Sequence, residues 1–300
     1  MAIFLLQPGL RCADMRLMDT IEKLLDEVEV LPASPSLLPK LLPILSDVDA
    51  NFDEVVDIIA IDPGLTAELL RICNSAFFGQ TEPIVNVQEA VARVGYQAVY
   101  LLVAMINGAN SFPTPAPRGI DISRLWAHSV TTAFSSKYIA ESTQQDASLL
   151  FTAGLLHDVG KIVMAQAQPE ALSGQLYGPT EESGLKHEKE LFGFTHAEVG
   201  MALLKRWGLP EKLISAVSHH HAPDGVNGLE PLAACVQLGD LFSHGQTDRR
   251  VLASPQFMSR LTALELGPQS MQNWFQQLQN NQPLIDGMSQ LQNISRPVRK

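Results

Sequence analysis

All eight histidines of the 300-residue chain lie between His128 and His244, so none lies in the first 127 residues or in the last 56. Together with carboxylates, imidazoles are the side chains that proteins offer to borderline divalent metals. The middle of the chain is therefore where we look for metal chemistry.

The central motif is Gly-Leu-Leu-His-Asp-Val-Gly-Lys, which ends at Lys161. An apolar run from Leu149 precedes it and predicts a helix that delivers His157 and Asp158 at its end. Neighbouring positions near a helix terminus can both reach one ion. Lys161 follows His157 by about one turn, so its ammonium can meet an anionic oxygen. A lone His–Asp pair is more often a cap or a salt bridge, so the motif needs support from elsewhere.

Support comes from residues predicted to lie on the apolar faces or at the ends of other helices: His128, His196, His219, His220, His221 and Asp240. A capping box of Thr195 with Glu198 opens one of these helices, and Pro210 begins another. An aspartate on an apolar face is costly to bury without a partner. Taken singly, each histidine is more simply a satisfied core residue. His187 and His244 have polar neighbours and are interpreted as surface histidines.

Nearly all of the chain is predicted to be helical. Asp62-Pro63 has the pattern of an N-cap followed by proline at the first helical position. Asn86 with Glu89 predicts a capping box, and Gly95 is placed to end that helix. No run of alternating apolar and polar residues bounded by hairpin turns is found. These signals predict an all-α fold.

The clearest break in the helical pattern contains three prolines, Pro113, Pro115 and Pro117. It separates an N-terminal helical half from the half that carries the histidines. Beyond Pro255 the chain is rich in glutamine and asparagine, but Trp274 and Leu278 keep a helical spacing. We expect this end to form a peripheral helix.

Composition bounds the class of protein. Hydrophobic residues make up 46% of the chain, which is too many for a disordered protein, and the net charge is −11. An acidic chain lacks the basic face that DNA binding needs. The longest apolar run, residues 98–106, is about half of a membrane span, and the first ten residues lack the basic start of a signal peptide. Three cysteines give no disulfide framework. We expect a cytoplasmic protein without DNA or membrane partners.

The order His128, His157-Asp158, Asp240 resembles the HD superfamily of metal-dependent phosphohydrolases, in which such residues bind a divalent metal. Residues 155–161, 196–200 and 219–225 are similar to segments of the HD-GYP cyclic-di-GMP phosphodiesterases. That family continues with Gly-Tyr-Pro, whereas Val226-Asn227-Gly228 stands here. This departure argues against cyclic-di-GMP hydrolysis.

Further segments resemble the HDOD domain (HD-related output domain). They are Leu31-Pro32 with Pro35, residues 62–66, residues 74–78, Glu89-Ala90 with Gly95, residues 126–129 and residues 207–210. The resemblance implies a multi-helix HDOD fold with an N-terminal helical subdomain and an HD-type helical bundle. We expect an N-terminal extension over 1–24, the HDOD domain over 25–245 and a C-terminal helical segment over 246–300. Within the domain, the N-terminal half is 25–110 and the HD-like half is 121–245.

The same resemblance implies one or two ions of a divalent transition metal (iron, manganese, nickel or zinc). The implied ligands are His128, His157, Asp158, His196, His219, His220 and Asp240. His128, His157, Asp158 and Asp240 would hold one ion, and the other three histidines a second, with Asp158 as the bridge. In a catalytic version Asp158 and Lys161 are the catalytic residues, and Lys161 neutralises charge on phosphoryl oxygens.

HDOD domains are bacterial signalling modules, found alone or as response-regulator outputs, and many act through protein contacts after losing the metal ligands. We therefore expect a signal-transduction output module with a retained metal site, which acts through protein–protein contacts or by ligand sensing. The alternative is an active metal-dependent phosphohydrolase or phosphodiesterase. The expected partners are a signalling protein and a nucleotide or cyclic dinucleotide. The sequence leaves the oligomeric state open.

Overall fold

The structure is a computed structural model, and it describes residues 12–28, 37–45, 52–75, 78–111, 116, 120–168, 181–225 and 228–289. Within these ranges the regular secondary structure is helical apart from one antiparallel pair of two-residue strands, β1 (Asp224–Gly225) and β2 (Gly228–Leu229). The predicted all-α fold is confirmed. The predicted proline break (Pro113, Pro115, Pro117), the Leu31-Pro32 and Pro35 segment and Val226-Asn227 lie outside the described residues.

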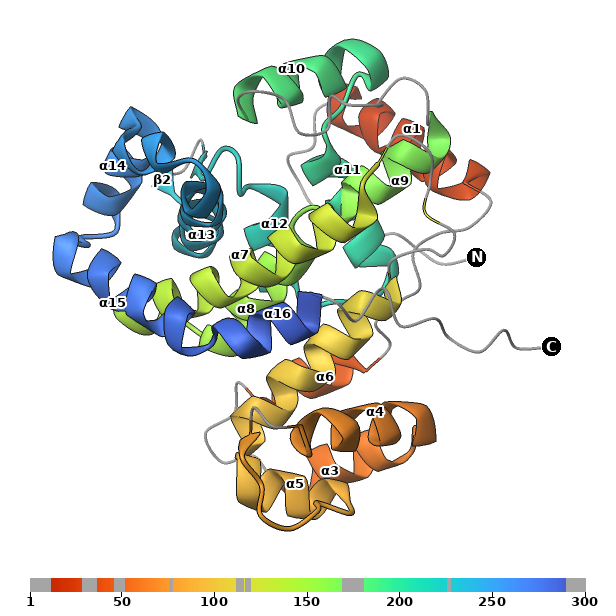
Figure 1. The fold of residues 1–300 in the computed structure, drawn as a ribbon. Coiled ribbons are helices and arrows are strands. Elements are labelled where there is room, and N and C mark those ends of the chain that lie inside the picture. Colours follow the sequence, from red (N-terminus) through yellow and green to blue (C-terminus); the bar gives the residue numbers. More distant parts are fainter. Residues whose placement is uncertain are drawn as a thin grey trace.

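The N-terminal half forms a separate group of helices, seen at the bottom of Figure 1. Its helices are α2 (Leu38–Leu45), α3 (Phe52–Ala60), α4 (Pro63–Cys73), α5 (Val87–Val94) and α6 (Tyr96–Ser111). As predicted, Asp62 caps α4 and Pro63 is its first residue. Asn86 caps α5 by accepting a hydrogen bond from the Glu89 backbone N–H. The predicted box is only half formed, because the Glu89 carboxylate accepts from the N–H of Val85 instead. Helix α6 leads from this group into the rest of the molecule.

The HD-like half is built around one long helix, α7 (Ile122–Thr143), which packs against α8 (Ala147–Leu156) and α13 (Pro231–Thr247). Two glycines let the three backbones approach closely. A Cβ on Gly154 of α8 would lie 2.9 Å from the Thr132 carbonyl oxygen, and one on Gly239 of α13 would lie 3.0 Å from the Ser136 nitrogen. Gly239 precedes Asp240 directly, so this close packing also sets the position of that carboxylate.

Four shorter helices complete this half: α9 (Val159–Ala167), α10 (Glu181–Phe192), α11 (His196–Arg206) and α12 (Glu211–Ser218). Thr195 and Glu198 form the predicted capping box at the start of α11. Helix α12 begins after Pro210, as predicted, and ends at the histidine triplet. Each of the predicted histidine-bearing segments therefore lies on a helix or at a helix end.

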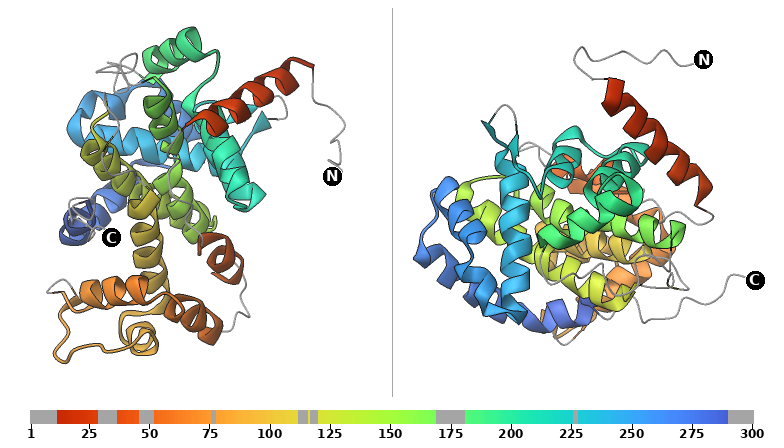
Figure 2. Two further views of the ribbon diagram at one scale, coloured as in Figure 1. Left: turned by 90° about the vertical axis from the view of Figure 1, so that its right-hand side faces the viewer. Right: turned by 90° about the horizontal axis from the view of Figure 1, so that it is seen from above.

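The N-terminal helix α1 (Cys12–Glu27) packs against α11 and α9 of the HD-like half. Figure 2 shows it beside these helices, away from α3–α5. The Arg206 guanidinium forms ion pairs with Glu22 and, at 2.9 Å, with Asp26. The predicted boundary between residues 24 and 25 falls inside this helix.

The C-terminal segment contains η2 (Arg249–Ala253), α14 (Pro255–Ala263), α15 (Pro268–Asn280) and α16 (Gln282–Ser289). Helices α15 and α16 lie along α7 (Figure 1). Trp274 is 1% exposed, and the indole N–H of Trp126 donates to the Met288 carbonyl oxygen at 2.8 Å. The expected helix is present as α15, which buries Trp274 and Leu278 against the core from one face and leaves its glutamine-rich face exposed.

One segment, Ala147–Ala167, is long and apolar enough to cross a membrane by length and composition. It comprises α8 and α9, which are separated by a turn at His157 and Asp158. Of its most apolar window, 89% is buried inside the protein. These properties are those of core helices, and helix α8 is apolar on all sides because all sides are covered.

Candidate metal centre

Five separate elements bring imidazoles and carboxylates to one place. His128 comes from α7, His157 and Asp158 from the turn between α8 and α9, and Asp240 from α13. Two further elements contribute histidines: His196 is the first residue of α11, and the end of α12 carries His219, His220 and His221. The centre is therefore made of side chains at helix ends and on core-facing sides, which explains why they converge despite wide separation in sequence.

Several imidazoles are held by hydrogen bonds at Nδ1. The Nδ1–H of His157 donates to the Gly154 carbonyl oxygen at 2.8 Å, and that of His220 donates to the Val217 carbonyl oxygen at 2.6 Å. A carbonyl only accepts, so the proton lies on Nδ1 and the Nε2 lone pair is free. This is the arrangement that orients metal-binding histidines. Burial lowers the pKa of His157 and lowers that of His220 well below its usual range, which keeps both rings neutral.

We call His128, His157, Asp158 and Asp240 the first cluster. The Nε2 atom of His128 lies 2.9 Å from Asp240 Oδ1, and that of His157 lies 3.7 Å from the same oxygen. Asp158 Oδ2 is 3.4 Å from His157 Nε2 and 3.9 Å from His128 Nε2. Donor atoms bound to one ion at about 2.1 Å lie about 3.0–4.2 Å apart, depending on the angle between them. The four separations, 2.9–3.9 Å, are about those of atoms that can share one ion.

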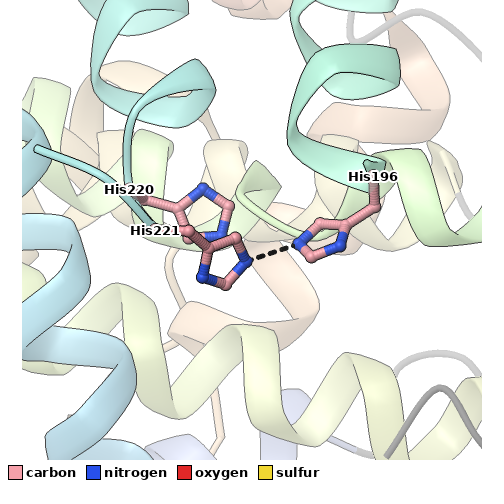
Figure 3. A group of neighbouring side chains, drawn as sticks. All are labelled: His196, His220 and His221. Carbon is pink, nitrogen blue, oxygen red and sulfur yellow. Dashed lines mark hydrogen bonds between the residues drawn. The ribbon is translucent and has the colours of Figure 1, made fainter. Parts of the chain in front are cut away.

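We call His196, His220 and His221, together with Asp158, the second cluster, and Figure 3 shows its three histidines. His196 Nε2 lies 2.8 Å from His221 Nε2 and 3.1 Å from Asp158 Oδ1. The rings of His220 and His221 are 3.8 Å apart between centroids. Two imidazole lone pairs repel at 2.8 Å, so either a proton or a cation must lie between these nitrogens. The two oxygens of Asp158 face different clusters, as a bridging carboxylate requires.

The polar atoms at the centre of these clusters fit a divalent ion. Five of them are buried and make no hydrogen bond within the described part of the chain: His128 Nε2, His157 Nε2, Asp158 Oδ1, His220 Nε2 and Asp240 Oδ1. A buried polar atom without a partner costs about 1–3 kcal/mol, and a charged one costs more. A cation among them would give every one of these atoms a partner. Nitrogen and oxygen donors of this kind suit zinc, iron, manganese or nickel.

Asp158 also forms an ion pair with Lys161. Lys161 Nζ lies 2.7 Å from Asp158 Oδ2. Burial alone would raise the pKa of Asp158, but the polar and charged groups around it, the Lys161 ammonium among them, outweigh burial and hold that pKa well below its usual range. Burial opposes the charge of Lys161, yet Asp158 raises the lysine pKa above its ordinary value. Both groups are thus ionised at neutral pH.

Glu188 on α10 contacts the second cluster and was not among the residues predicted from the sequence. Both of its carboxylate oxygens lie within 2.9 Å of His196 Nδ1, and Oε2 accepts the His196 backbone N–H at 2.8 Å. Although burial opposes it, the Glu188 charge raises the pKa of His196 to about 9. A signal exists in the sequence, because Leu185, Glu188 and Phe192 share one helix face.

One predicted ligand does not join the centre. His219 is exposed, and its Nδ1 atom lies 2.9 Å from Ser218 Oγ. His221, which was not predicted as a ligand, takes the place predicted for His219 beside His196 and His220. The helix ends at Ser218, so the chain direction after it is set by the turn and not by helical spacing. His187, predicted at the surface, is half-buried on α10.

A cavity of about 150 Å³ lies elsewhere, between α6, α7 and α16. Its walls include Leu101, Phe134 and Leu284, with Lys137 and Tyr138 as polar neighbours. It contains no residue of either cluster. In the described part of the chain this cavity is therefore separate from the two clusters.

We expect Glu188→Gln to lower the affinity of the second cluster for its ion and to leave the affinity of the first cluster unchanged. The amide cannot hold His196 with the charge of the carboxylate, and loss of such a partner typically costs 10–100-fold in metal affinity. Titration of the purified variant with Zn²⁺ against a competing chelator measures this loss for each ion. Glu190→Gln is the matched control, because Glu190 lies on the same helix, is exposed and only faces Lys186 at 3.8 Å. Equal affinities in the two variants would contradict the role assigned to Glu188.

Comparison with known proteins gives a family match. The model of the HDOD domain family matches residues 31–223 of the chain. This range takes in the N-terminal half, His128, His157, Asp158 and the second cluster, and it stops before Asp240. The match covers most of the chain, including the histidine-rich segments on which the resemblance to this family rested.

Individual proteins are similar over parts of the chain. A protein of unassigned function from Treponema pallidum (strain Nichols) is 27% identical over 230 residues, which are 74% of this chain and 44% of that protein. A ribonuclease Y of Thermus thermophilus is 31% identical over 138 residues, 46% of this chain and 19% of the enzyme. The chain thus spans less than half the length of these relatives.

The fold is also found among solved structures. An HDOD domain protein with unknown function from Geobacter sulfurreducens superposes with a TM-score of 0.69. The alignment covers 92% of this chain and 98% of that protein at 24% sequence identity. At this identity the likeness establishes the fold alone, including the helices beyond the family match.

Proposed function

This chain belongs to the HDOD domain family, and from that membership and the geometry of the two clusters we propose a signal-transduction module that holds divalent transition-metal ions. The signalling role follows from the family. We expect the module to act on a signalling protein through its helical surface, or to respond to a bound nucleotide or cyclic dinucleotide. The metal-binding role rests on this chain's own residues.

The observation that carries the proposal is the set of buried ligand atoms without hydrogen bonds. His128 Nε2, His157 Nε2 and Asp240 Oδ1 point to the first ion, and His220 Nε2 points to the second. Two of the rings are already fixed through Nδ1, so the centre is organised before any ion enters. A site that is prepared in this way binds metal without first having to order its ligands.

The proposed ligand sets follow the clusters. The first ion is held by His128, His157, Asp158 and Asp240. The second is held by His196, His220 and His221, with Asp158 shared between the two. Imidazole-rich sites with one or two carboxylates suit iron, manganese, nickel or zinc. The ligand atoms of His128, His157 and Asp158 lie within 4.8 Å of one another. The same is true of the ligand atoms of His196, His220 and His221.

Phosphoester hydrolysis is a second candidate function, favoured by the position of Lys161. Its ammonium lies beside Asp158 with 16% of its side chain exposed, and His128 is 14% exposed. One edge of the first cluster is thus within reach of a ligand from solvent, and Lys161 can pair with a phosphoryl oxygen there. Divalent ions supply Lewis acidity to such a reaction and acidify water. The relative ribonuclease Y is named for cleavage of RNA.

Turnover separates the two functions. Metal-loaded protein is incubated with bis(4-nitrophenyl) phosphate and with a panel of nucleotides and cyclic dinucleotides, and product is followed. The proposed signalling role predicts no turnover. If hydrolysis occurs, Lys161→Gln should retain its metal and lose about 100-fold in rate, since one charged partner of the transition state is removed. Turnover that chelation abolishes would replace the signalling proposal with the enzymatic one.

A further inference from the structure

One imidazole at the edge of the first cluster has no part in the ligand sets above. His244 follows Asp240 by one helical turn on α13, and 48% of its side chain is exposed. Its Nε2 atom lies 3.4 Å from Asp240 Oδ1. Its ring centroid is 4.6 Å from that of His128, with 31° between the ring planes. The polar neighbours of His244 in sequence suggested an ordinary surface residue, but its ring faces the cluster.

The spacing of these atoms fits a single coordination sphere. His128, Asp240 and His244 each offer one ligand atom, and the three atoms lie within 4.8 Å of one another. Adjacent donors on one ion lie about 3.0–3.4 Å apart when each bond is about 2.1 Å. The 3.4 Å between His244 Nε2 and Asp240 Oδ1 agrees with this spacing.

A separate third ion on these residues is chemically excluded while the first ion is bound. The Nε2 atom of an imidazole has one lone pair and so binds one ion at a time. His128 Nε2 is a ligand of the first ion. An ion that the His244 ring binds in this centre would therefore be the first ion, approached from the side that faces solvent.

We propose that His244 is a detachable ligand that holds the open position of the first ion until a phosphate-bearing ligand displaces it. This inference rests on the proposed function, because it requires the first ion. His157 is buried and held at Nδ1 by a carbonyl oxygen, whereas in the described part of the chain no hydrogen bond fixes the His244 ring. An exposed ring without such a bond can rotate away at little cost. Lys161, which is paired with Asp158 and partly exposed, would supply a cation for the incoming anion.

Displacement has a measurable cost for the ligand. If the His244 ring occupies the position for about nine-tenths of the time, only about a tenth of the molecules can accept phosphate. The apparent affinity for phosphate is then about tenfold weaker than that of the open centre. Removal of the His244 ring should therefore raise the apparent affinity for phosphate about tenfold. It should also weaken metal binding, because one ligand is lost.

The test uses His244→Ala in the full chain loaded with Co²⁺. We expect the same number of bound ions as in the wild type, about tenfold weaker affinity for the first ion in competition with a chelator, and a stronger visible absorption band, because a lower coordination number intensifies it. Inorganic phosphate should bind about tenfold tighter by calorimetry. His219→Ala is the control, since His219 is also exposed at a helix end but lies outside both clusters.

Two results would overturn the inference. If His244→Ala matches the control in metal affinity, absorption and phosphate binding, His244 is not a ligand. If the variant loses one whole ion while the first cluster stays filled, His244 belongs to a separate site. A wild-type protein that binds no Co²⁺ would instead contradict the proposed function itself, so the two failures are distinguishable.

Discussion

Asp158→Asn is expected to remove both ions from the protein at once. Asp158 offers one oxygen to each cluster: Oδ2 lies 3.4 Å from His157 Nε2, and Oδ1 lies 3.1 Å from His196 Nε2. The amide has nearly the same shape, but it carries no charge and can offer only one oxygen. The other group donates hydrogen bonds, so one of the two clusters meets a donor where it needs an acceptor.

We expect each ion to bind at least about 100-fold more weakly in this variant, since loss of a supporting residue alone costs about 10–100-fold. Elemental analysis after gel filtration measures the metal content, and circular dichroism checks that the helices remain. Lys161 loses its partner at 2.7 Å, so the free energy of unfolding should fall by about 1–3 kcal/mol. Asp286→Asn, an exposed residue of α16, is the control and should keep its metal. Loss of one ion with full retention of the other would show that Asp158 does not bridge the clusters.

Gly160→Ala is expected to be the most destabilising of the conservative substitutions at the centre. A Cβ on Gly160 would lie 2.0 Å from the carbonyl oxygen of His196 and 2.8 Å from the backbone nitrogen of Gly200. Both atoms belong to the backbone of α11, so no side-chain rotation can relieve the overlap. Helices α9 and α11 would have to move apart, and His196, at the start of α11, would move with them.

Overpacking of a tight core costs about 1–3 kcal/mol and occasionally more, and the approach to backbone atoms places this substitution at the upper end. We therefore expect the free energy of unfolding in urea to fall by at least about 3 kcal/mol, with weaker binding of the second ion. Gly200→Ala is a matched control on the facing helix. Its Cβ would meet its nearest neighbour, Val217 Cγ1, at 3.6 Å, an ordinary contact. Alanine is the better helix former by about 0.5–1 kcal/mol, so this variant should be as stable as the wild type or more so. Equal free energies of unfolding for Gly160→Ala and Gly200→Ala would contradict the close packing of α9 against α11.

Much of the centre could be predicted because helix-end signals are local. Asp62 with Pro63, and Thr195 with Glu198, mark helix starts by hydrogen bonds within one turn, and the structure has those helices where they were expected. The apolar run before His157 fixed the end of α8 in the same way. Local patterns thus placed His157, His196 and Asp240 on the right elements.

What could not be predicted depends on contacts between distant segments. Three consecutive histidines after Ser218 leave open which of them turn inward, because the turn beyond the helix decides it. His221 turns toward His196, and His219 turns to solvent. Glu188 becomes a partner of His196 only because α10 packs beside the start of α11. His244 was within reach of prediction, since it shares a helix face with Asp240 at a spacing of four residues.

The C-terminal segment also depends on contacts between distant parts of the chain. Glutamine and asparagine dominate the C-terminal segment, and the helical spacing of Trp274 and Leu278 predicted a peripheral helix there. A few apolar positions outweigh that composition: Trp274 packs against Phe242, with ring centroids 5.6 Å apart, and its indole N–H donates to Ser142 Oγ at 2.9 Å. Burial of one tryptophan contributes as much as several smaller side chains. Sparse apolar residues on one face are therefore enough to attach a helix to the core.

The metal content of the wild-type protein tests the central claim most directly. Protein purified without added metal is analysed for its elements, and a crystal is measured at the absorption edge of whichever metal is found. We predict one or two equivalents of iron, manganese, nickel or zinc, with anomalous density between His157, Asp158 and Asp240 and, for a second ion, between His196, His220 and His221. A fully folded protein that contains no metal and binds none when it is supplied would contradict the account.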